Sequence, residues 1–243
     1  MGGAGEVSPG AKIVFPVWKE AGLSGDDFRD RLLQSLAPVL LDFGRVRWLR
    51  IAVVDSAVEP AAARRLENCQ PLPDGVVSVY LSGAGAGRTD ESAIETAIRP
   101  HVASVHGYQV LESEVIAHPA RSGQRVEGFC QVVFLQRPEH LTRAQWLELW
   151  QGSHTQVAID TQATFAYRQN VITQALDDDA PLLHAMIEES FPGPAMTSDQ
   201  AFYGVSNDRD LQIKQATMLD SCARFIDFNK IDVIPMSEYV FRG

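Results

Sequence analysis

The sequence is short of cysteine and of positive charge, and each shortage excludes a class of protein. Cysteine occurs three times in 243 residues, at positions 69, 130 and 222. No CxxC spacing is present, so the sequence predicts neither a disulfide framework nor a zinc site, and a reducing cytoplasm is the expected location. Lys and Arg number 21 against 31 Asp and Glu, which gives a net charge of -10. This balance argues against binding to nucleic acid or to an anionic membrane.

Long apolar runs are also missing, and no stretch reaches the length of a transmembrane helix. The first residues, MGGAGEVSPGAK, do not place an apolar segment after a basic one, as a secretory signal would. We therefore interpret residues 1–11 as a flexible tail. No contact with a membrane is expected.

Familiar catalytic and cofactor signatures are absent as well. The sequence shows no nucleophile elbow, no Ser-His-Asp arrangement and no nucleotide-binding fingerprint. The histidines have no spacing typical of a metal site. We therefore expect no metal and no cofactor. These absences are compatible with an enzyme that transfers protons without a cofactor, and equally with a protein that only binds.

What the sequence does contain is an internal repeat with an offset of 118 residues. The segment 13–41 aligns with 132–159, so that Ser24 falls on Thr142 and Leu32 on Trp150. Each copy begins with a β-branched and aromatic run and continues into a helical pattern. In the second copy Thr142 and Gln145 form the pattern of a capping box, which marks a helix start.

Both halves predict the order strand, helix, strand, strand, helix, strand, which is that of a ferredoxin-like unit. Such a unit covers one face of its sheet with helices and leaves the other face bare, so a second unit has to cover it. We predict an α+β protein of two ferredoxin-like repeats, whose antiparallel sheets lie face to face and form a pseudo-dimeric α+β barrel. The expected boundaries are 12–118 for a degenerate first repeat, 119–128 for a linker and 129–243 for the second repeat.

The second half carries a resemblance to a known family. It contains VVFLQRPEHLTRAQWLELWQGSHTQVA, then AYRQN, then RFIDFNKIDVIPMSEYVF. This combination, and above all the Trp-x-x-x-His of Trp150 and His154, resembles the EthD domain of the dimeric α+β barrel superfamily over about residues 127–241. The resemblance implies a scaffold that works without a cofactor, and some relatives decarboxylate, isomerise or cyclise aromatic or polyketide-like compounds. Many EthD-like sequences have a histidine where this one has Val171, which puts a mechanism with two histidines in doubt.

His154 is the leading catalytic candidate. It continues an apolar helical stripe with Trp146 and Trp150 and is therefore expected to point inward. The equivalent residue of the first repeat is Leu36, so the fold accepts an aliphatic side chain at this point. Burying an imidazole costs roughly 1–3 kcal/mol unless it is hydrogen-bonded, and its near-neutral pKa suits proton transfer. Catalysis, ligand binding and simple packing all stay open.

Further site residues are expected around His154. Tyr167 alternates onto one strand face with Gln169 and is the second catalytic candidate, as a group that holds an oxyanion. Residues expected to bind substrate are Trp146, Trp150, Asn170, His184 and Tyr203.

The leading hypothesis is a cofactor-independent lyase or isomerase that acts on a small apolar aromatic or keto compound, with His154 as general acid or base. The alternative is a non-catalytic protein of a degradation pathway that binds a hydrophobic ligand. Haem binding is a third possibility, because some barrels of the superfamily hold haem through a histidine. A homodimer is possible.

Overall fold

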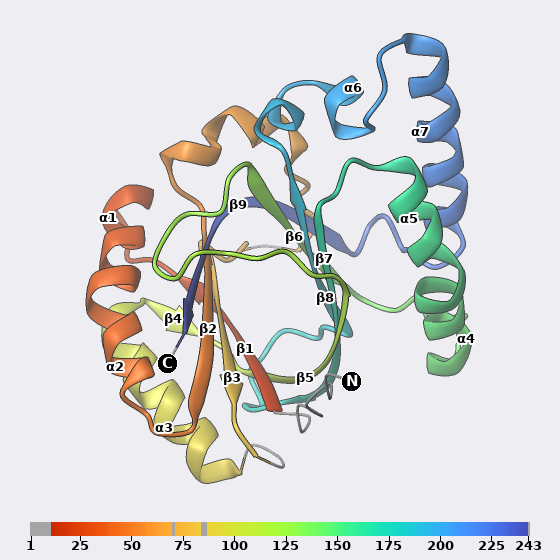
Figure 1. Cartoon of the computed structure of the whole chain (residues 1–243). Helices are drawn as coiled ribbons and strands as arrows, with labels where there is room; N and C mark the ends of the chain where they lie inside the picture. The colour runs from red at the N-terminus through yellow and green to blue at the C-terminus, as the bar shows by residue number, and fades with distance from the viewer. Residues whose placement is uncertain (1–10, 70, 84–86, 243) are drawn as a thin grey trace, which may run out of the picture.

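The computed structural model describes residues 11–69, 71–83 and 87–242 and shows an antiparallel β-barrel between two helical layers (Figure 1). The expected tail lies outside these ranges, apart from residue 11. The strands are β1 (Ala11–Trp18), β2 (Val46–Val53), β3 (Gly75–Leu81), β4 (Ser104–Val105), β5 (Tyr108–Ile116), β6 (Phe129–Leu135), β7 (Ala166–Ala175), β8 (Ala185–Phe191) and β9 (Ile231–Arg242). No helix in the described ranges combines the length and apolar character needed to cross a bilayer.

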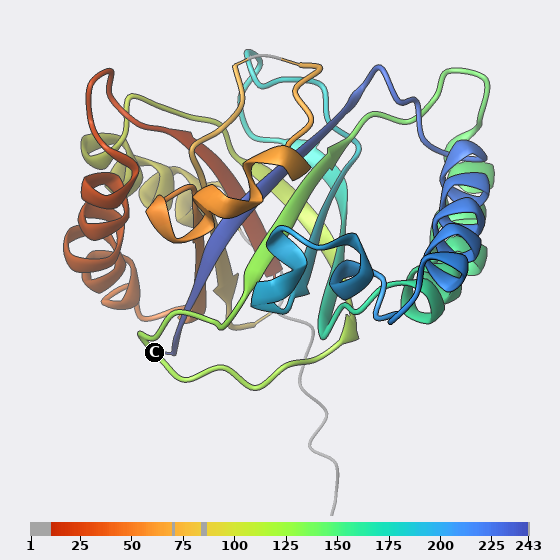
Figure 2. The same cartoon turned by 90° about the horizontal axis from the view of Figure 1, so that it is seen from above.

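The helices form one layer from each half of the chain. On one side lie α1 (Gly25–Arg31), η1 (Leu32–Leu36), α2 (Ala37–Leu41), α3 (Arg88–Ile98) and η3 (Arg99–His101), and on the other lie α4 (Arg143–Leu147), η4 (Glu148–His154), α5 (Thr155–Thr161) and α7 (Asp208–Ala223). The short segments η2 (Ser56–Arg64), η5 (Gly193–Met196) and α6 (Asp199–Phe202) connect strands and helices. Seen from above, the barrel separates the two layers (Figure 2).

Sequence signals account for the helix starts. The Thr142 hydroxyl accepts a hydrogen bond from the backbone N–H of Gln145, and the Gln145 side chain accepts one from the N–H of Thr142. The expected capping box is therefore confirmed. Ser24 caps α1 in the same way through the N–H of Asp27. In both halves the helix then passes through a π-helical turn, η1 or η4, before it continues as an α-helix.

Strand order follows one pattern in both halves. The first half pairs its strands in the order β5-β1-β3-β2 and the second in the order β9-β6-β8-β7. Pairing of β2 with β9 and of β5 with β7 then closes the barrel. The α+β class and the barrel are as expected, but the two sheets are not separate layers that merely face each other. They are hydrogen-bonded along both edges, which removes every unpaired edge of the eight-stranded ring.

Gly128 fixes the entry into β6. Its φ is +85°, a region that favours glycine, and a Cβ added there would lie 1.9 Å from the carbonyl oxygen of Phe191. The segment between the halves runs along β9, with a bridge from Arg125 to Tyr239 and a backbone bond from Val126 to Glu238.

Alternation along the strands separates the barrel interior from the helical layers. Side chains at Ile13, Phe15 and Val17 pack outward against the first helical layer, whereas Val14 packs inside the barrel. The middle of the interior is apolar and contains Phe134, Met186, Ile234 and Met236, among others.

One end of the interior contains charged side chains instead. Lys12 bonds Glu112 at 2.5 Å and Glu188 at 2.8 Å, Arg168 contacts Glu188 and Glu238, and Arg50 lies 3.2 Å from Glu238. Burial raises the pKa of Glu188, but Lys12 and Arg168 outweigh it and hold that pKa well below its usual value. The network therefore stays charged and plugs this end of the barrel.

Candidate functional site

A cluster of polar side chains lies in the second helical layer, between the helices and the outer face of the sheet. We call it the second-half polar cluster. Its members are His154, Thr155, Tyr167, Gln169, Glu189, Ser221 and Cys222. The surrounding layer is apolar and includes Trp146, Trp150 and Phe225.

His154 ends the π-helical turn and is 6% exposed, so the expected inward orientation is confirmed. Its Nδ1 lies 2.9 Å from the hydroxyl of Ser221 on α7, and its ring packs 4.7 Å from that of Phe225. Burial, with a smaller effect of Arg224, lowers the pKa of His154 to about 4. The imidazole is therefore neutral at physiological pH.

Tyr167 and Gln169 share the outer face of β7, as their alternation predicts. The Gln169 amide donates to the Tyr167 hydroxyl and to the hydroxyl of Thr155, both at 2.8 Å. Thr155 directly follows His154, so this chain of hydrogen bonds connects β7 to the helix that carries the histidine. Burial raises the pKa of Tyr167, so that its hydroxyl remains a hydrogen-bond donor.

Glu189 completes the cluster and was missed in the sequence. It lies on β8 directly across from Tyr167 and is 6% exposed. Within the described part of the chain its carboxylate forms no hydrogen bond or ion pair. Burial raises its pKa to about 7. Burial also raises the pKa values of Tyr167 and Cys222, and the charge of Glu189 adds to both shifts. Cys222 follows Ser221 on α7, which links Glu189 to the helix that faces His154.

The other expected site residues fall in different places. Trp146 and Trp150 pack against each other in this layer with ring centroids 5.1 Å apart, and Tyr203 packs at its border. Asn170 points the opposite way, into the barrel, where its amide donates to Glu188 at 3.0 Å. His184 is half-buried directly before β8, not within a strand, and accepts a hydrogen bond from the backbone N–H of Arg137. The structure thus brings His154, Tyr167 and the two tryptophans together and separates Asn170 from them.

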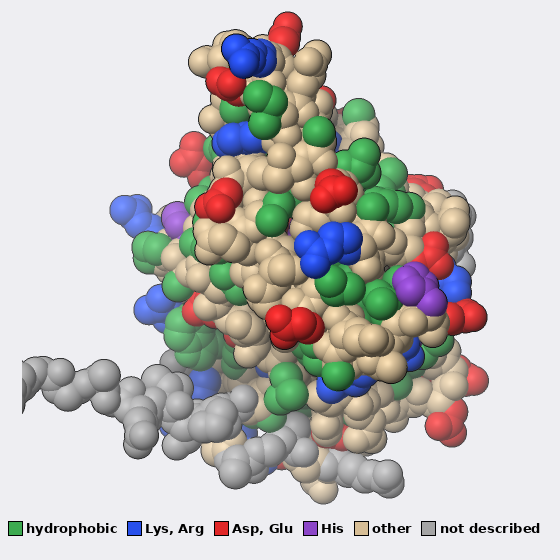
Figure 3. Space-filling model, turned by 90° about the vertical axis from the view of Figure 1, so that its right-hand side faces the viewer, with side chains coloured by type: hydrophobic (Ala, Val, Ile, Leu, Met, Phe, Trp, Pro, Cys, Tyr) green, Lys and Arg blue, Asp and Glu red, His purple; other side chains and the backbone are tan. Residues whose placement is uncertain are grey.

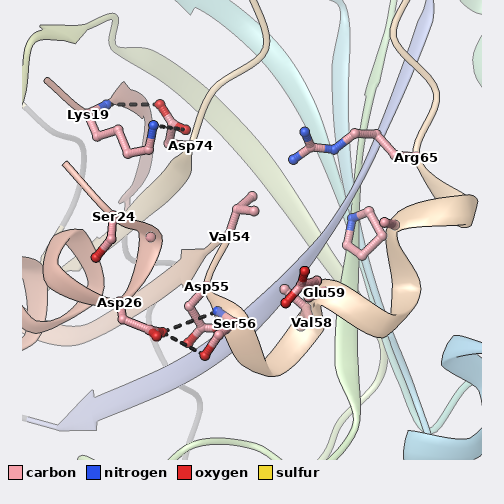
Figure 4. Close-up of a pocket in the computed structure, with 13 residues that line it drawn as sticks. Lys19, Ser24, Asp26, Val54, Asp55, Ser56, Val58, Glu59, Arg65 and Asp74 are labelled. Atoms are coloured by element: carbon pink, nitrogen blue, oxygen red, sulfur yellow. Dashed lines mark hydrogen bonds and ion pairs between the residues drawn. The ribbon is translucent and has the colours of Figure 1, made fainter. Parts of the chain in front are cut away.

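Several surface pockets lie away from this cluster, among them the following two. The first, of about 510 Å³, opens beside α1 and η2 (Figure 4). Its charged groups are largely engaged with partners: Lys19 with Asp74, and Asp26 with Ser56. The second pocket, of about 350 Å³, is mainly apolar and lies at the end of the barrel opposite the charged network. In the described ranges no three His, Cys, Asp or Glu side chains come together as a possible metal site.

The outer surface over the second-half polar cluster is mixed in character. On the face formed by α4, α5 and α7, acidic, basic and apolar side chains are interspersed over the described residues (Figure 3). Ile213 and Leu219 on α7 are exposed within it.

Comparison with known proteins places the fold. No protein-family model matches the sequence, and no curated protein sequence matches it either. Among solved structures, an anthrone oxidase-like protein is similar with a TM-score of 0.57 and 8% identity, over 97% of this chain and 94% of that one. A Fusobacterium nucleatum protein named as a candidate monooxygenase gives a TM-score of 0.45 and 6% identity, over 98% and 94% of the two chains. The first likeness shows a shared fold and nothing more, and the second is too low to support an argument.

Proposed function

We propose that this protein is a small-molecule-processing enzyme that transfers protons within the second-half polar cluster. The observation that carries the proposal is Glu189, a residue only 6% exposed, whose carboxyl has no hydrogen-bond partner among the described residues and a pKa raised by burial to about 7. A structural glutamate in a packed layer is ordinarily paired. A proton-transfer group, in contrast, works best when its pKa lies near the operating pH.

Each group of the cluster has its own role in the proposed reaction. The Glu189 carboxylate accepts a proton from a carbon next to a carbonyl group, and the electron pair of the broken C–H bond moves onto the carbonyl oxygen. The Tyr167 hydroxyl donates a hydrogen bond to that developing oxyanion. Where the substrate has a C=C bond conjugated with this enolate, return of the proton to the γ-carbon and shift of the double bond complete an isomerisation. In a decarboxylation, loss of carbon dioxide generates the same enolate, and protonated Glu189 supplies the proton.

His154 enters this scheme as a neutral ring. Its pKa of about 4 means that at neutral pH it begins as a proton acceptor and not as an acid. We assign it the relay of a proton to or from the substrate, with Ser221 fixing the orientation of the ring. This retains the acid–base role expected from the sequence and adds Glu189 as the group whose pKa matches the task. Trp146 and Trp150 supply apolar walls that suit an aromatic or keto compound.

We include in this proposal that the chain consists of two related halves. Identical strand order in the two halves, and a π-helical turn at equivalent positions ending at Leu36 and His154, support two ferredoxin-like repeats that form a pseudo-dimer. We propose that the second repeat is EthD-like, that catalysis needs no cofactor and that the protein works in the cytoplasm, with a homodimer as a possible assembly. The anthrone in the name of the anthrone oxidase-like neighbour is a ring compound, and by analogy of fold this supports a small ring compound as the substrate.

One observation favours the alternative, a protein that binds a hydrophobic ligand without reaction. His154 is already bonded to Ser221 and packed on Phe225, which a structural histidine would also show. The two functions differ in what Glu189 and His154 do after a ligand has bound.

A paired binding and turnover screen separates them. Aromatic acids, phenols and β-keto compounds are tested by thermal shift and by product analysis on the wild type, Glu189→Gln and His154→Leu. The last variant copies Leu36, and exposed His140→Leu is the matched control. We expect a ligand that stabilises all four proteins and is converted by the wild type and the control alone. Binding without conversion by any protein would favour the alternative, and no stabilisation by any compound would overturn both.

A further inference from the structure

The apolar pocket at the end of the barrel opposite the charged network is lined by a histidine, His106, that the proposed chemistry does not use. The pocket is lined from both halves of the chain, by Pro16 and Trp18 of β1, Phe134 of β6, and Leu183 before β8. Its volume of about 350 Å³ falls within the roughly 300–1,000 Å³ typical of small-molecule sites. Apolar residues of the barrel interior lie beneath it, and the charged network closes the far end, so the pocket has a floor.

His106 lines this pocket and is oriented by an aspartate. Its Nδ1 lies 2.9 Å from Oδ1 of Asp177, a residue 71 positions later that the pairing of β5 with β7 brings alongside. The ring also packs edge-to-face on Trp18, with centroids 5.6 Å apart and an interplanar angle of 80°. These two contacts hold the imidazole in one orientation.

Asp177 also sets the tautomer. A carboxylate only accepts hydrogen bonds, so the proton of a neutral imidazole sits on Nδ1 and a lone pair remains on Nε2. Within the described residues Nε2 has no hydrogen-bond partner. His106 is therefore prepared to accept a hydrogen bond from a ligand.

Several other polar groups of the pocket already have hydrogen-bond partners, whereas the Ser104 hydroxyl and the Gln136 side-chain carbonyl oxygen have none in the described residues. The Tyr108 hydroxyl donates to the carbonyl of Pro181 at 2.7 Å, and the Trp18 indole donates to the carbonyl of Pro71 at 3.1 Å. Asp232 accepts from the backbone N–H of Cys69 at 2.9 Å. Burial and the charge of Asp232 raise the pKa of the Cys69 thiol, which keeps it neutral. Among the lining groups, His106 combines a fixed ring orientation with an acceptor nitrogen that has no partner in the described residues.

We propose that this pocket is a second small-molecule site, which binds an apolar, ring-containing molecule carrying one hydroxyl group, of the phenol class. The rings lie against Trp18, Phe134 and Leu183, and the hydroxyl donates its proton to Nε2 of His106. An ether or ketone of the same shape offers no such proton, so the site distinguishes a phenol from its methyl ether. The first repeat thus contributes a binding group of its own.

The test compares 2-naphthol with 2-methoxynaphthalene by isothermal titration calorimetry on the whole protein. We expect the wild type to bind 2-naphthol about tenfold more tightly, which corresponds to ~1.4 kcal/mol for the one hydrogen bond. His106→Phe keeps an aromatic ring on Trp18 and is expected to bind both compounds equally. Leu183→Trp fills the pocket and is expected to weaken both by more than tenfold. Exposed His140→Phe is the matched control and should behave as the wild type.

Asp177→Asn tests the role of the tautomer without removing the ring. An amide can donate to Nδ1 and so move the ring proton to Nε2, which turns the lone pair into a donor. The preference for 2-naphthol should then disappear or reverse, with a melting temperature close to that of the wild type.

Several outcomes would overturn the proposal. These are equal affinity of the wild type for the two compounds, a preference that persists in His106→Phe, binding that Leu183→Trp does not weaken, and no binding of either compound. If His106→Phe does not fold, Asp177→Asn and Leu183→Trp still decide the matter. Turnover is not measured in this test, so its failure is distinct from that of the proposed enzymatic function.

Discussion

Glu189 and His154 should give the stability of the protein two opposing dependences on pH. Glu189 has its pKa raised from 4.5 to about 7 in the folded protein. Between these values the folded state holds a proton that the unfolded chain has released, so stability falls as pH rises. His154 has its pKa lowered from 6.5 to about 4. Here the unfolded chain takes up the proton first, so stability falls as pH decreases from 6.5 towards 4.

The two effects are of similar size. Each pKa difference is 2.5 (7 − 4.5 and 6.5 − 4), and one pKa unit is worth about 1.4 kcal/mol, which gives about 3 kcal/mol for each residue. Between about pH 4.5 and 6.5 the slopes oppose each other, and the wild type should show little net dependence from this pair. Replacing either residue leaves the pH dependence of stability that the other one causes uncompensated.

Urea unfolding across this pH range measures the difference directly. Relative to the wild type, Glu189→Gln should gain up to about 3 kcal/mol as pH rises from about 4 to 8, and His154→Leu should gain a similar amount as pH falls over the same range. Constant differences from altered packing cancel, because the change with pH is the quantity compared. Glu127→Gln, at an exposed position, should follow the wild type throughout. Variants whose stability curves run parallel to that of the wild type would refute the assignment of a raised pKa to Glu189 and of a lowered pKa to His154.

Two further predictions concern the barrel. Glu188→Gln leaves Lys12 and Arg168 partly uncompensated and should lower the free energy of unfolding by about 3–5 kcal/mol at neutral pH, measured with urea; a loss below 1 kcal/mol would contradict a continuous buried network. Gly128→Ala places a Cβ against the Phe191 carbonyl at a positive φ and should lower the melting temperature by roughly 5–15 °C, whereas Gly193→Ala, with open space around it, should change it little. Equal effects of the two glycine substitutions would contradict the strain argument.

The sequence predicted the order of elements because that order depends on local patterns. The capping box at Thr142 and the alternation of Tyr167 with Gln169 each involve neighbours along the chain, and the structure shows both. The same period of two already places Asn170 on the opposite face from Tyr167. Its expected position beside Tyr167 was therefore inconsistent with the strand assignment itself, and the structure shows it bonded to Glu188 inside the barrel.

The opposite pKa shifts of Glu188 and Glu189 could not be predicted from the sequence. They are adjacent on β8, yet Lys12 and Arg168 hold the pKa of one down while burial raises the pKa of the other. Alternation predicts that they face opposite sides, but which side holds the cations depends on residues about 20 and 176 positions away. Single charged residues within largely apolar strands, such as Lys12, Arg50 and Arg168, were a signal for a polar barrel interior. His106 and Asp177 had no such local signal, because the closure of the barrel alone brings them together.

Hydrogen–deuterium exchange into a ketone measures directly whether Glu189 removes a proton from a carbon next to a carbonyl group. Phenylacetone, an apolar aromatic ketone, is incubated in D₂O at neutral pD with the wild type, Glu189→Gln and the exposed-site control Glu127→Gln, and the protons next to its carbonyl are followed by NMR. We expect exchange with the wild type and the control at rates at least a hundredfold above that with Glu189→Gln, the lower end of a general-base contribution of about 10²–10⁴. Equal exchange with Glu189→Gln and the wild type would contradict this role of Glu189.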